Sequence, residues 1–542
     1  MKFGVFIDSY MIKRWQYNAI KKILDETVFD LELVILNDTD SKTSLPFKNL
    51  LFYVYKFFLV KSRESQKIDI RTLPSANFKT KLCKVEKKGK FSEYFIKEDI
   101  EDIKKSNLDF ALRFGFGIIR GEILKTFKHG VWSFHHGDES KYRGGPYCFW
   151  EIYKKDKENG AILQVLTNKL DGGIILKKGI FKTISHSYTK NIDQALKISS
   201  EWPSIICKQI ENNTFVKNTE PTVTNAPIYL LPKNHQVILF LFKIIFNSIR
   251  NIYYNYLTYD HWHVGILNKN IEEVMLNDIN KTEINWIKTE SNNSFIADPF
   301  IFNHNGETLL GLEYLHYKDF IGKIKVYKGK DFGTELPNFF ENVNYHLSYS
   351  NFFEFEDRFF CLPETFEANK LILFEKNGDK WKQHVLIDDV KPIDPDIIYY
   401  EGYYYLFTTF KGEHHETNVH IYYSKKIETG WKRHLLNPVV SDVRSARGAG
   451  KIFKIENDLF RPGQNYSIHK EGSISISKIK KLSPSEYEEE IVKEIPPIFG
   501  AKYADKIHTI NSINNITVID GCKIKSFFFR PDILWSLFRS KI

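Results

Sequence analysis

The sequence is poor in the features that mark disulfide-stabilised and secreted proteins. It has only five cysteines in 542 residues, at Cys83, Cys148, Cys207, Cys361 and Cys522, an odd number without a Cys-x-x-Cys pair. This pattern argues against a disulfide framework or a zinc site and favours a reducing compartment. The apolar run at the amino terminus is too short for the hydrophobic region of a signal peptide. We therefore expect a cytoplasmic protein.

Long uninterrupted hydrophobic runs are also lacking. Leu50–Val60 is very apolar but too short to cross a bilayer, so a buried or interfacial helix is expected there. Gln236–Tyr256 is longer, but Lys243 and Arg250 interrupt it. We expect a helix packed between domains, with peripheral contact to a membrane as the alternative.

Proline and glycine are scarce, at 18 and 29 residues, while 42% of the residues are hydrophobic and 27% charged. This composition is that of a globular protein, and its length predicts two or three domains. The net charge of +10 has no long basic block. It suits a phosphate-bearing substrate or an anionic membrane as well as nucleic acid, and a generally lysine-rich composition explains it equally. We expect no nucleic-acid partner.

The first 210 residues show apolar strands alternating with helical spacing, which predicts an α/β domain with a sheet covered on both faces. The expected strands are Lys2–Asp8, Leu31–Leu36, Asp109–Phe116, Gly130–Phe134 and Ala161–Leu166, and the expected helices are Trp15–Glu26, Glu122–Lys128 and Pro146–Lys157.

Polar residues follow two of these strands directly. His135 and His136 lie past the strand at Gly130–Phe134, and Asp171 lies in a glycine-flanked loop after the next strand. Ligands of open α/β sheets bind beyond the carboxyl ends of the strands. We therefore expect an imidazole and a carboxylate at the same edge of the sheet.

These motifs resemble the formyltransferase catalytic domain shared by methionyl-tRNA, glycinamide-ribonucleotide and sugar N-formyltransferases. The family's Asn-x-His and Tyr-Arg-Gly elements align with Ser133–His135 and Tyr142–Gly144, and its Leu-Asp-x-Gly element aligns with Leu170–Gly173. The resemblance implies a Rossmann-like fold and transfer of a formyl group from 10-formyltetrahydrofolate to an amine.

The resemblance also implies roles for individual residues. His135 and Asp171 serve the charge and proton steps, together with Ser133 as the third catalytic position. The cofactor would contact Arg113, Phe114, Gly115, Phe116, Gly117, Ile118, Thr167 and Leu170, and the substrate His136, Tyr142, Arg143 and Gly144. For Phe114 and Phe116, ordinary core packing is the favoured interpretation. For Arg143, a structural salt bridge is as good an explanation as substrate contact.

One position departs from the family in a way that bears on catalysis. Ser133 replaces the asparagine, so a hydroxyl with one donor stands where an amide has two. His136 could compensate, or the acceptor could differ. Gln164 stands where some relatives carry histidine.

The second half has high aromatic content and recurring hairpin patterns, which predict a sheet-rich domain. Two-residue turns are expected at Asn305-Gly306, Glu356-Asp357, Glu401-Gly402, Glu456-Asn457 and Asn514-Asn515. Their spacing of roughly 45 to 58 residues is typical of propeller blades, and five repeats predict a five-bladed β-propeller.

A string of motifs in this half resembles the amino-terminal region of plant glucosamine inositolphosphorylceramide transferase over about residues 261–500. The motifs include ADPF at Ala297–Phe300, PET at Pro363–Thr365, DPD at Asp394–Asp396 and RSARGAG at Arg444–Gly450. More distantly the region resembles five-bladed glycosidases.

Charged residues of these motifs are expected in a central funnel, namely Asp298, Glu364, Asp396, Arg444 and Arg447. Paired carboxylates would suit glycoside hydrolysis, but carbohydrate binding or scaffolding is favoured, and inter-blade ion pairs are the purely structural alternative.

The expected organisation is a formyltransferase-like domain at 1–210, a linker with an apolar helix at 211–260, a propeller at 261–525 and an aromatic, basic tail at 526–542. The expected function is N-formylation of an amino sugar, nucleotide-linked, in surface glycan biosynthesis, with a glycan at the propeller as a further partner and no metal. The alternatives are a glycosidase-like propeller enzyme or a glycan-binding protein, each with a degenerate first domain. The acceptor amine and the oligomeric state are not predicted.

Overall fold

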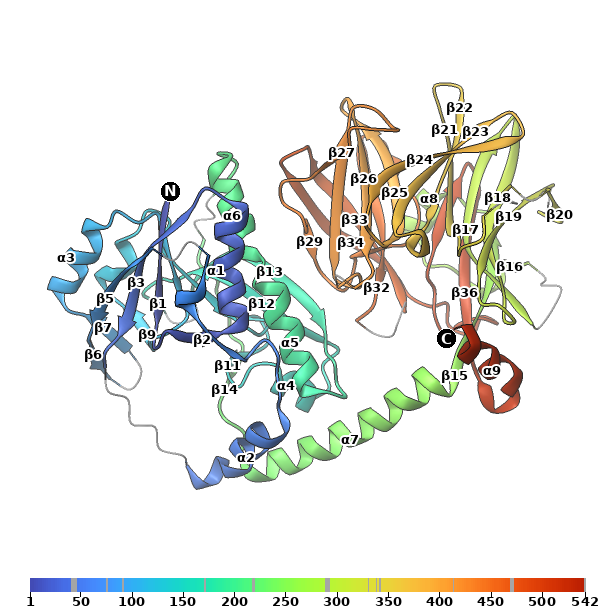
Figure 1. The fold of residues 1–542 in the computed structure, drawn as a ribbon. Helices are drawn as coiled ribbons and strands as arrows, with labels where there is room; N and C mark the ends of the chain where they lie inside the picture. The colour runs from blue at the N-terminus through green and yellow to red at the C-terminus, as the bar shows by residue number, and fades with distance from the viewer. Residues whose placement is uncertain are drawn as a thin grey trace. The chain divides into compact units, whose positions relative to one another are not determined.

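The computed structural model describes residues 1–39, 46–74, 77–89, 92–169, 172–216, 220–287, 293–329, 331–337, 339–340, 343–412, 414–467 and 472–540. The chain divides into two compact units, Met1–Ile249 and Arg250–Ile542. In Figure 1 the first unit runs from blue to green, and the second from yellow-green to red.

The first unit is built on a mixed seven-stranded sheet. In spatial order its strands are β13 (Ile174–Lys182), β12 (Glu158–Val165), β10 (Val131–His135), β8 (Phe110–Arg113), β1 (Lys2–Ile7), β3 (Asp30–Asn37) and β5 (Lys79–Cys83). The small sheets pair β2 (Met11–Lys13) with β4 (Lys67–Asp69), β6 (Val85–Lys88) with β7 (Ser92–Phe95) and β9 (Ile118–Arg120), and β11 (Arg143–Gly144) with β14 (Ile228–Tyr229).

The helices of this unit are α1 (Arg14–Glu26), α2 (Leu50–Leu59), α3 (Lys97–Lys105), α4 (Phe149–Lys154), α5 (Tyr188–Ser199), α6 (Trp202–Glu211) and α7 (Asn234–Tyr256), which continues into the second unit. The expected helix at Glu122–Lys128 is a 3-10 turn, Glu122–Lys125. The helix expected from Pro146 begins only at Phe149, because Cys148 takes a left-handed φ of 64° that an α-helix excludes.

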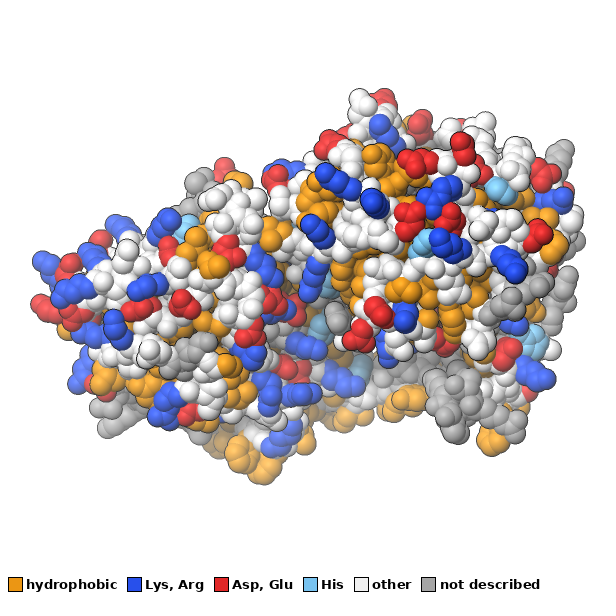
Figure 2. Space-filling model, turned by 45° about the horizontal axis from the view of Figure 1, so that its top comes forward, with side chains coloured by type: hydrophobic (Ala, Val, Ile, Leu, Met, Phe, Trp, Pro, Cys, Tyr) orange, Lys and Arg blue, Asp and Glu red, His pale blue; other side chains and the backbone are white. Residues whose placement is uncertain are grey.

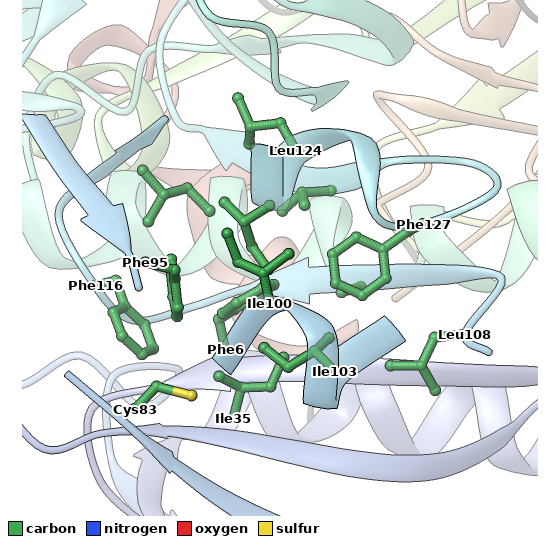
Figure 3. Packing of buried hydrophobic residues seen from close by; sticks show 14 of the residues in the cluster. Phe6, Ile35, Cys83, Phe95, Ile100, Ile103, Leu108, Phe116, Leu124 and Phe127 are labelled. Carbon is green, nitrogen blue, oxygen red and sulfur yellow. The ribbon is translucent and has the colours of Figure 1, made fainter. Parts of the chain in front are cut away.

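Both faces of the sheet are buried, as expected. Phe6 and Ile35 pack with Ile100 and Ile103 of α3 in one core cluster (Figure 3). The neighbouring residue Val5 is also fully buried but lies outside this cluster. Because successive side chains of a strand point to opposite faces, the sheet carries packed side chains on each side.

The direction of β12 differs from the expectation. β10 is parallel to β8, but β12 runs antiparallel to β10, with His135 opposite Ile162 and Trp132 opposite Val165. The carboxyl end of β12 therefore lies beside the start of β10, where Leu166 N–H donates to Val131 O at 2.8 Å. The prediction that both strands end at the same edge was wrong, because an α/β alternation alone does not determine strand direction.

The second unit, in the part that the structure describes, contains five antiparallel sheets. The first combines β16 (Asn285–Trp286), β15 (Thr258–Leu267), β36 (Ile516–Ser526) and β35 (Ile510–Ile513), and the second has β17 (Ser294–His304), β18 (Glu307–His316), β19 (Gly322–Lys328) and β20 (Thr334–Glu335). The third has β21 (Ser348–Phe355), β22 (Arg358–Glu364), β23 (Lys370–Asn377) and β24 (Lys380–Asp388).

The fourth sheet has β25 (Pro392–Tyr400), β26 (Tyr403–Phe410), β27 (Asn418–Ser424), β28 (Lys432–Arg433) and β29 (Val440–Ser441). The fifth has β30 (Arg447–Gly448), β31 (Phe453–Ile455), β32 (Asp458–Asn465), β33 (Ser473–Leu482) and β34 (Tyr487–Ile495). The helices here are α8 (Ile271–Leu276) and α9 (Pro531–Ser540).

All five expected hairpin turns are confirmed. In each, the two turn residues lie between a pair of facing strand residues, as where His304 faces Glu307 across Asn305-Gly306. Successive sheets contact one another through aromatic side chains, such as Phe300 and Tyr349 with ring centroids 4.7 Å apart. The fifth sheet also contacts the first, because Ile510 N–H donates to Ala449 O at 2.8 Å.

Candidate functional sites

The turn after β8 is held by side chains from three parts of the first unit. The Arg113 guanidinium donates from Nη1 to the carbonyls of Phe116 (3.1 Å) and Gly117 (2.8 Å). Asp8 accepts the Phe116 N–H at 2.7 Å, and Glu93 accepts the Gly117 N–H at 2.6 Å. The backbone expected to face a cofactor is therefore a rigid turn.

The remaining residues of this turn are fixed by packing. Phe116 is 8% exposed and belongs to the core cluster, with its ring 5.1 Å from that of Phe95. Phe114 packs edge-on against Trp15 at 5.3 Å. A Cβ on Gly115 would lie 2.5 Å from the backbone nitrogen of Asp8, so glycine is needed there, and Ile118 begins β9. Core packing is thus confirmed for Phe116.

Ser133 lies buried in β10, next to the half-buried side chain of Arg113. Arg113 Nε donates to Ser133 Oγ at 3.2 Å. A hydroxyl that accepts from a cation directs its own hydrogen elsewhere, so Ser133 can still donate to another acceptor. Arg113 therefore gives Ser133 the character of a polarised donor.

His135 lies two residues further along β10, on the same face of the strand as Ser133. Its Nε2 is 2.9 Å from the carbonyl oxygen of Tyr142. A carbonyl only accepts, so Nε2 carries a hydrogen, and the neutral imidazole has its lone pair at Nδ1. Gly137 permits this approach, since a Cβ there would lie 3.0 Å from Nε2.

His136 occupies a different environment. Its Nε2 lies 3.1 Å from Ser199 Oγ, and its ring packs edge-on to Trp15 at 5.1 Å. Burial, with smaller contributions from the charges of His135 and Lys13, lowers the pKa of His136 to about 3. His136 is therefore a neutral residue that packs in the core, and its side-chain hydrogen bond is with Ser199 and not with Ser133. Arg113 contacts Ser133 instead.

The Tyr-Arg-Gly segment is anchored at its start and end. The Tyr142 hydroxyl donates to Asp156 at 2.6 Å, and Arg143 donates from Nη1 to Ala226 O at 3.1 Å. Gly144 has a φ of 81°, and a Cβ there would lie 2.2 Å from Tyr229 O. The segment is thus held against β14 by backbone contacts that exclude a side chain.

The loop after β12 is described only at its ends. Leu170 and Asp171 lie outside the described residues, so their roles stay predictions. Thr167 Oγ1 donates to Gly172 O at 2.7 Å, and a Cβ on Gly173 would lie 2.0 Å from Gln164 Oε1. Gln164 faces Ser133 across the strand pair, which connects this loop to β10.

A second candidate site lies in the second unit, where three strands carry bulges at equivalent places. Asp298, Tyr349 and Asp394 have φ values of 48°, 52° and 44°, each at a register shift in β17, β21 or β25. Positive φ in such residues is strained, and strained backbone is concentrated at functional sites. The bulges bring these side chains into one buried network.

Contacts between sheets define this network. Asp298 accepts the Tyr349 N–H at 3.2 Å and pairs with His508 Nδ1 at 2.8 Å. Asp394 binds Arg447 and accepts from Gln464 Nε2 at 3.0 Å, and its N–H donates to Glu364 Oε2 at 3.0 Å. Three of the predicted funnel residues, Asp298, Glu364 and Arg447, thus meet in one network.

The carboxyl groups of this network have opposite pKa shifts. Burial alone would raise the pKa of Asp298, but His508 and Arg447 hold it below its usual value. Burial, reinforced by the charge of Asp394, raises the pKa of Glu364 well above its usual value. Divergent pKa values of neighbouring carboxyls are typical of general acid and base pairs.

Two predicted funnel residues have other hydrogen-bond or ion-pair partners. Asp396 accepts from Asn351 Nδ2 at 2.7 Å, and burial raises its pKa to about 6. Arg444 pairs with Asp442 at 2.7 Å. The prediction named Asp396 of the Asp-Pro-Asp motif and missed Asp394, which lies at the bulge of β25.

Other functional candidates were missed by sequence reasoning: Asp8, Glu93, Asp394, His508 and Asp520. The Asp-Pro dipeptide of Asp394 repeats that of Asp298 and could have identified it. Among the described residues, Asp298, His508 and Asp520 have donor atoms within 4.8 Å of one another, a spacing that suits a metal ion. Asp520 Oδ1, however, already accepts the N–H groups of His508 (2.8 Å) and Thr509 (2.9 Å).

Comparison with known proteins bears out both resemblances. Residues 281–508 match the family described as glucosamine inositolphosphorylceramide transferase 1, N-terminal. The rice (Oryza sativa subsp. japonica) protein of that name is 29% identical over 222 residues, which cover 39% of this chain and 29% of the rice protein.

Formyltransferases are also among the relatives. Methionyl-tRNA formyltransferase of Prochlorococcus marinus (strain AS9601) is 25% identical over 126 residues, which cover 23% of this chain and 38% of the relative. The solved structure of WlaRD, a sugar 3N-formyl transferase, aligns with a TM-score of 0.28 at 15% identity, over 57% of this chain and 93% of that one. The chain thus spans less than two fifths of the length of either curated relative.

Proposed function

We propose that this protein is a 10-formyltetrahydrofolate-dependent N-formyltransferase that acts on an amino sugar, and that its five antiparallel sheets are the blades of a carbohydrate-associated propeller. The observation that carries the proposal is the arrangement on β10. There Ser133, polarised by Arg113, and His135, oriented by Tyr142, lie two residues apart on one strand face.

The donor set of this strand end fits the proposed cofactor. Transfer of a formyl group needs a donor for the formyl oxygen and an acceptor for the proton of the amine, and Ser133 and His135 offer these two groups. The turn after β8, held rigid by Asp8, Glu93 and Arg113, suits a preformed wall against which the cofactor would lie. When bound, the cofactor supplies an activated formyl group.

The chain's own residues then have distinct tasks. His135 Nδ1 would accept the proton of the attacking amine and return it to the nitrogen whose bond to the formyl carbon breaks, while the Tyr142 carbonyl keeps Nε2–H in place. The Ser133 hydroxyl donates to the formyl oxygen as that oxygen gains negative charge, and Arg113 strengthens this donor. The resemblance assigns the tuning of His135 to Asp171, but Asp171 lies outside the described residues and follows a strand that ends beside the start of β10, so no step is assigned to it.

The test uses purified full-length protein, 10-formyltetrahydrofolate and a panel of nucleotide-linked amino sugars, with the formylated product identified by mass spectrometry. Ser133→Ala is expected to lower kcat by about 10²- to 10³-fold, and His135→Ala by about 10²- to 10⁴-fold. His186→Gln, in the loop before α5, is the matched control and keeps wild-type activity. Absence of product with every amino sugar, or full activity in both site variants, would refute the proposal.

A second candidate function rests on the buried carboxyls of the second unit. We infer that Asp298 and Glu364, with their opposite pKa shifts, could act on a glycoside as charged base and neutral acid. Release of sugar from oligosaccharides, abolished in Asp298→Asn but unchanged in Asp442→Asn, would support this function. If neither wild type nor variants release sugar, the network is structural.

A further inference from the structure

Helix α7 contacts the first unit through two apolar and several polar side chains, and it leaves most of its other apolar side chains exposed. Val237 and Phe240 are buried. Lys243 donates to Tyr153 O, Asn247 to Ser185 O at 3.1 Å, and Ser248 to His186 O at 3.2 Å. This is the reverse of the polarity expected for a surface helix in water.

The opposite side of α7 is entirely apolar over the same turns. Its side chains are 46% to 66% exposed, and they are Ile238, Leu239, Phe242, Ile245, Phe246 and Ile249. This helix is long and apolar enough to cross a membrane by length and composition. Crossing would however remove Val237, Phe240 and Lys243 from their contacts with the first unit. The geometry therefore favours a helix that lies along a membrane surface.

Helix α2 packs beside α7 and extends this apolar side. Leu51 N–H donates to Asn234 Oδ1 at 3.0 Å, and the rings of Tyr55 and Phe240 are 5.9 Å apart. The exposed apolar side chains next to these contacts include Phe47 (81%), Phe57 (72%), Phe58 (64%) and Leu59 (64%). We call the exposed apolar side chains of residues 47–59 and 238–249 the α2–α7 face. In Figure 2 hydrophobic side chains gather along the lower edge, where Figure 1 places α2 and the start of α7.

The two sequence segments that carry this face are basic. Residues 46–63 contain four Lys or Arg and no Asp or Glu, and residues 221–249 contain two Lys and no acid. Lys48, Lys56, Lys61, Arg63 and Lys233 are exposed. An apolar face with a basic border complements a membrane with anionic lipids.

We propose that the α2–α7 face is a peripheral membrane-binding surface, which inserts its apolar side chains at the interface of an anionic bilayer while its basic residues bind the lipid phosphates. A protein partner would not require this excess of positive charge. The formyl chemistry plays no part in this inference.

The test is flotation of the full chain with phosphatidylcholine vesicles, either pure or containing about 30% phosphatidylglycerol. Wild type is expected to bind the anionic vesicles and to dissociate as salt rises. Replacing Phe57, Phe58, Phe242 and Phe246 together by serine should weaken binding at least about tenfold. The matched control Phe499→Ser replaces a side chain that is 96% exposed in the second unit and should bind as wild type.

Charge variants separate the insertion of the apolar side chains from the electrostatic attraction of the basic ones to the lipid phosphates. Lys48→Gln, Lys56→Gln and Lys61→Gln should each weaken binding by about fivefold. All replaced side chains are exposed, so the fold is retained, and far-ultraviolet circular dichroism verifies it. Failure of wild type to bind anionic vesicles, or equal binding of the quadruple serine variant, would overturn the proposal. A wild-type dimer that the quadruple variant converts to monomer without any vesicle binding would instead assign the face to a second copy of the chain.

Discussion

His136 is expected to make the first unit sensitive to mild acid. Burial lowers its pKa from 6.5 to about 3, whereas the unfolded chain binds a proton near the ordinary value. The unfolded state therefore takes up more protons as the pH falls below 6.5, and stability is lost across the window down to the folded pKa. From pH 6.5 to about pH 5 the loss is about 2 kcal/mol.

Glu151 contributes to the pH dependence of stability with the opposite sign, so its contribution must be separated from that of His136. It is 2% exposed, and burial, with the charges of Asp156 and Asp138, raises its pKa to about 8. Its folded form keeps a proton that the unfolded chain loses, so acidification toward about pH 5 stabilises the fold through this residue. The observed pH dependence of wild type is thus a sum of opposed contributions.

The assay compares the pH dependence of stability between each variant and wild type. His136→Gln keeps a polar atom near Ser199 Oγ and should remove about 2 kcal/mol of acid destabilisation between pH 6.5 and about pH 5. Glu151→Gln should change the pH dependence in the opposite sense. Hydrogen exchange of peptides from β10 and α5, corrected for intrinsic rates, reports local stability within the full chain. If His136→Gln follows the wild-type pH curve, the assignment of His136 as a neutral core residue is refuted.

Three further predictions concern packing and ion pairs. Gly144→Ala should destabilise the first unit by about 2 kcal/mol or more, because a Cβ would lie 2.2 Å from Tyr229 O. Gly306→Ala is the control, since its Cβ would meet open space, and its backbone strain should cost only about 1 kcal/mol. Thermal unfolding measures both losses. Asp298→Asn should destabilise the second unit by about 3 kcal/mol at neutral pH. The pKa of Asp298 is depressed in the folded protein, so wild type loses this stability only as the pH falls below the usual carboxyl range. An acid titration in which wild type and variant lose equal stability would contradict this prediction. Arg461→Met should cost about 3 to 5 kcal/mol by leaving the carboxylate of Glu489 without its cation, and Arg461→Met with Glu489→Leu should recover most of it. A double variant as unstable as the single one would disprove the explanation.

The sequence alone was sufficient for features whose physical causes are local. The hairpin turns at Asn305-Gly306 and its four counterparts were located correctly, because residues that tolerate positive φ mark two-residue turns. The strands of the first unit follow from short apolar runs in the same way. The motifs around Ser133 and Asp298 were also sufficient to identify the resemblances to formyltransferases and to glucosamine inositolphosphorylceramide transferase, which the comparisons bear out.

Only the tertiary structure decided which side chains meet. The direction of β12 depends on packing that no periodicity encodes, and at the bulge in β25 Asp394 contacts Glu364, whereas Asp396 contacts Asn351. His135 and His136 are adjacent in sequence, yet one contacts a backbone carbonyl and the other the core. Ser133 gains its donor strength from Arg113, twenty residues earlier in the chain. Turn and strand preferences are properties of neighbouring residues, whereas burial, pKa and hydrogen-bond partners depend on residues that only folding brings together.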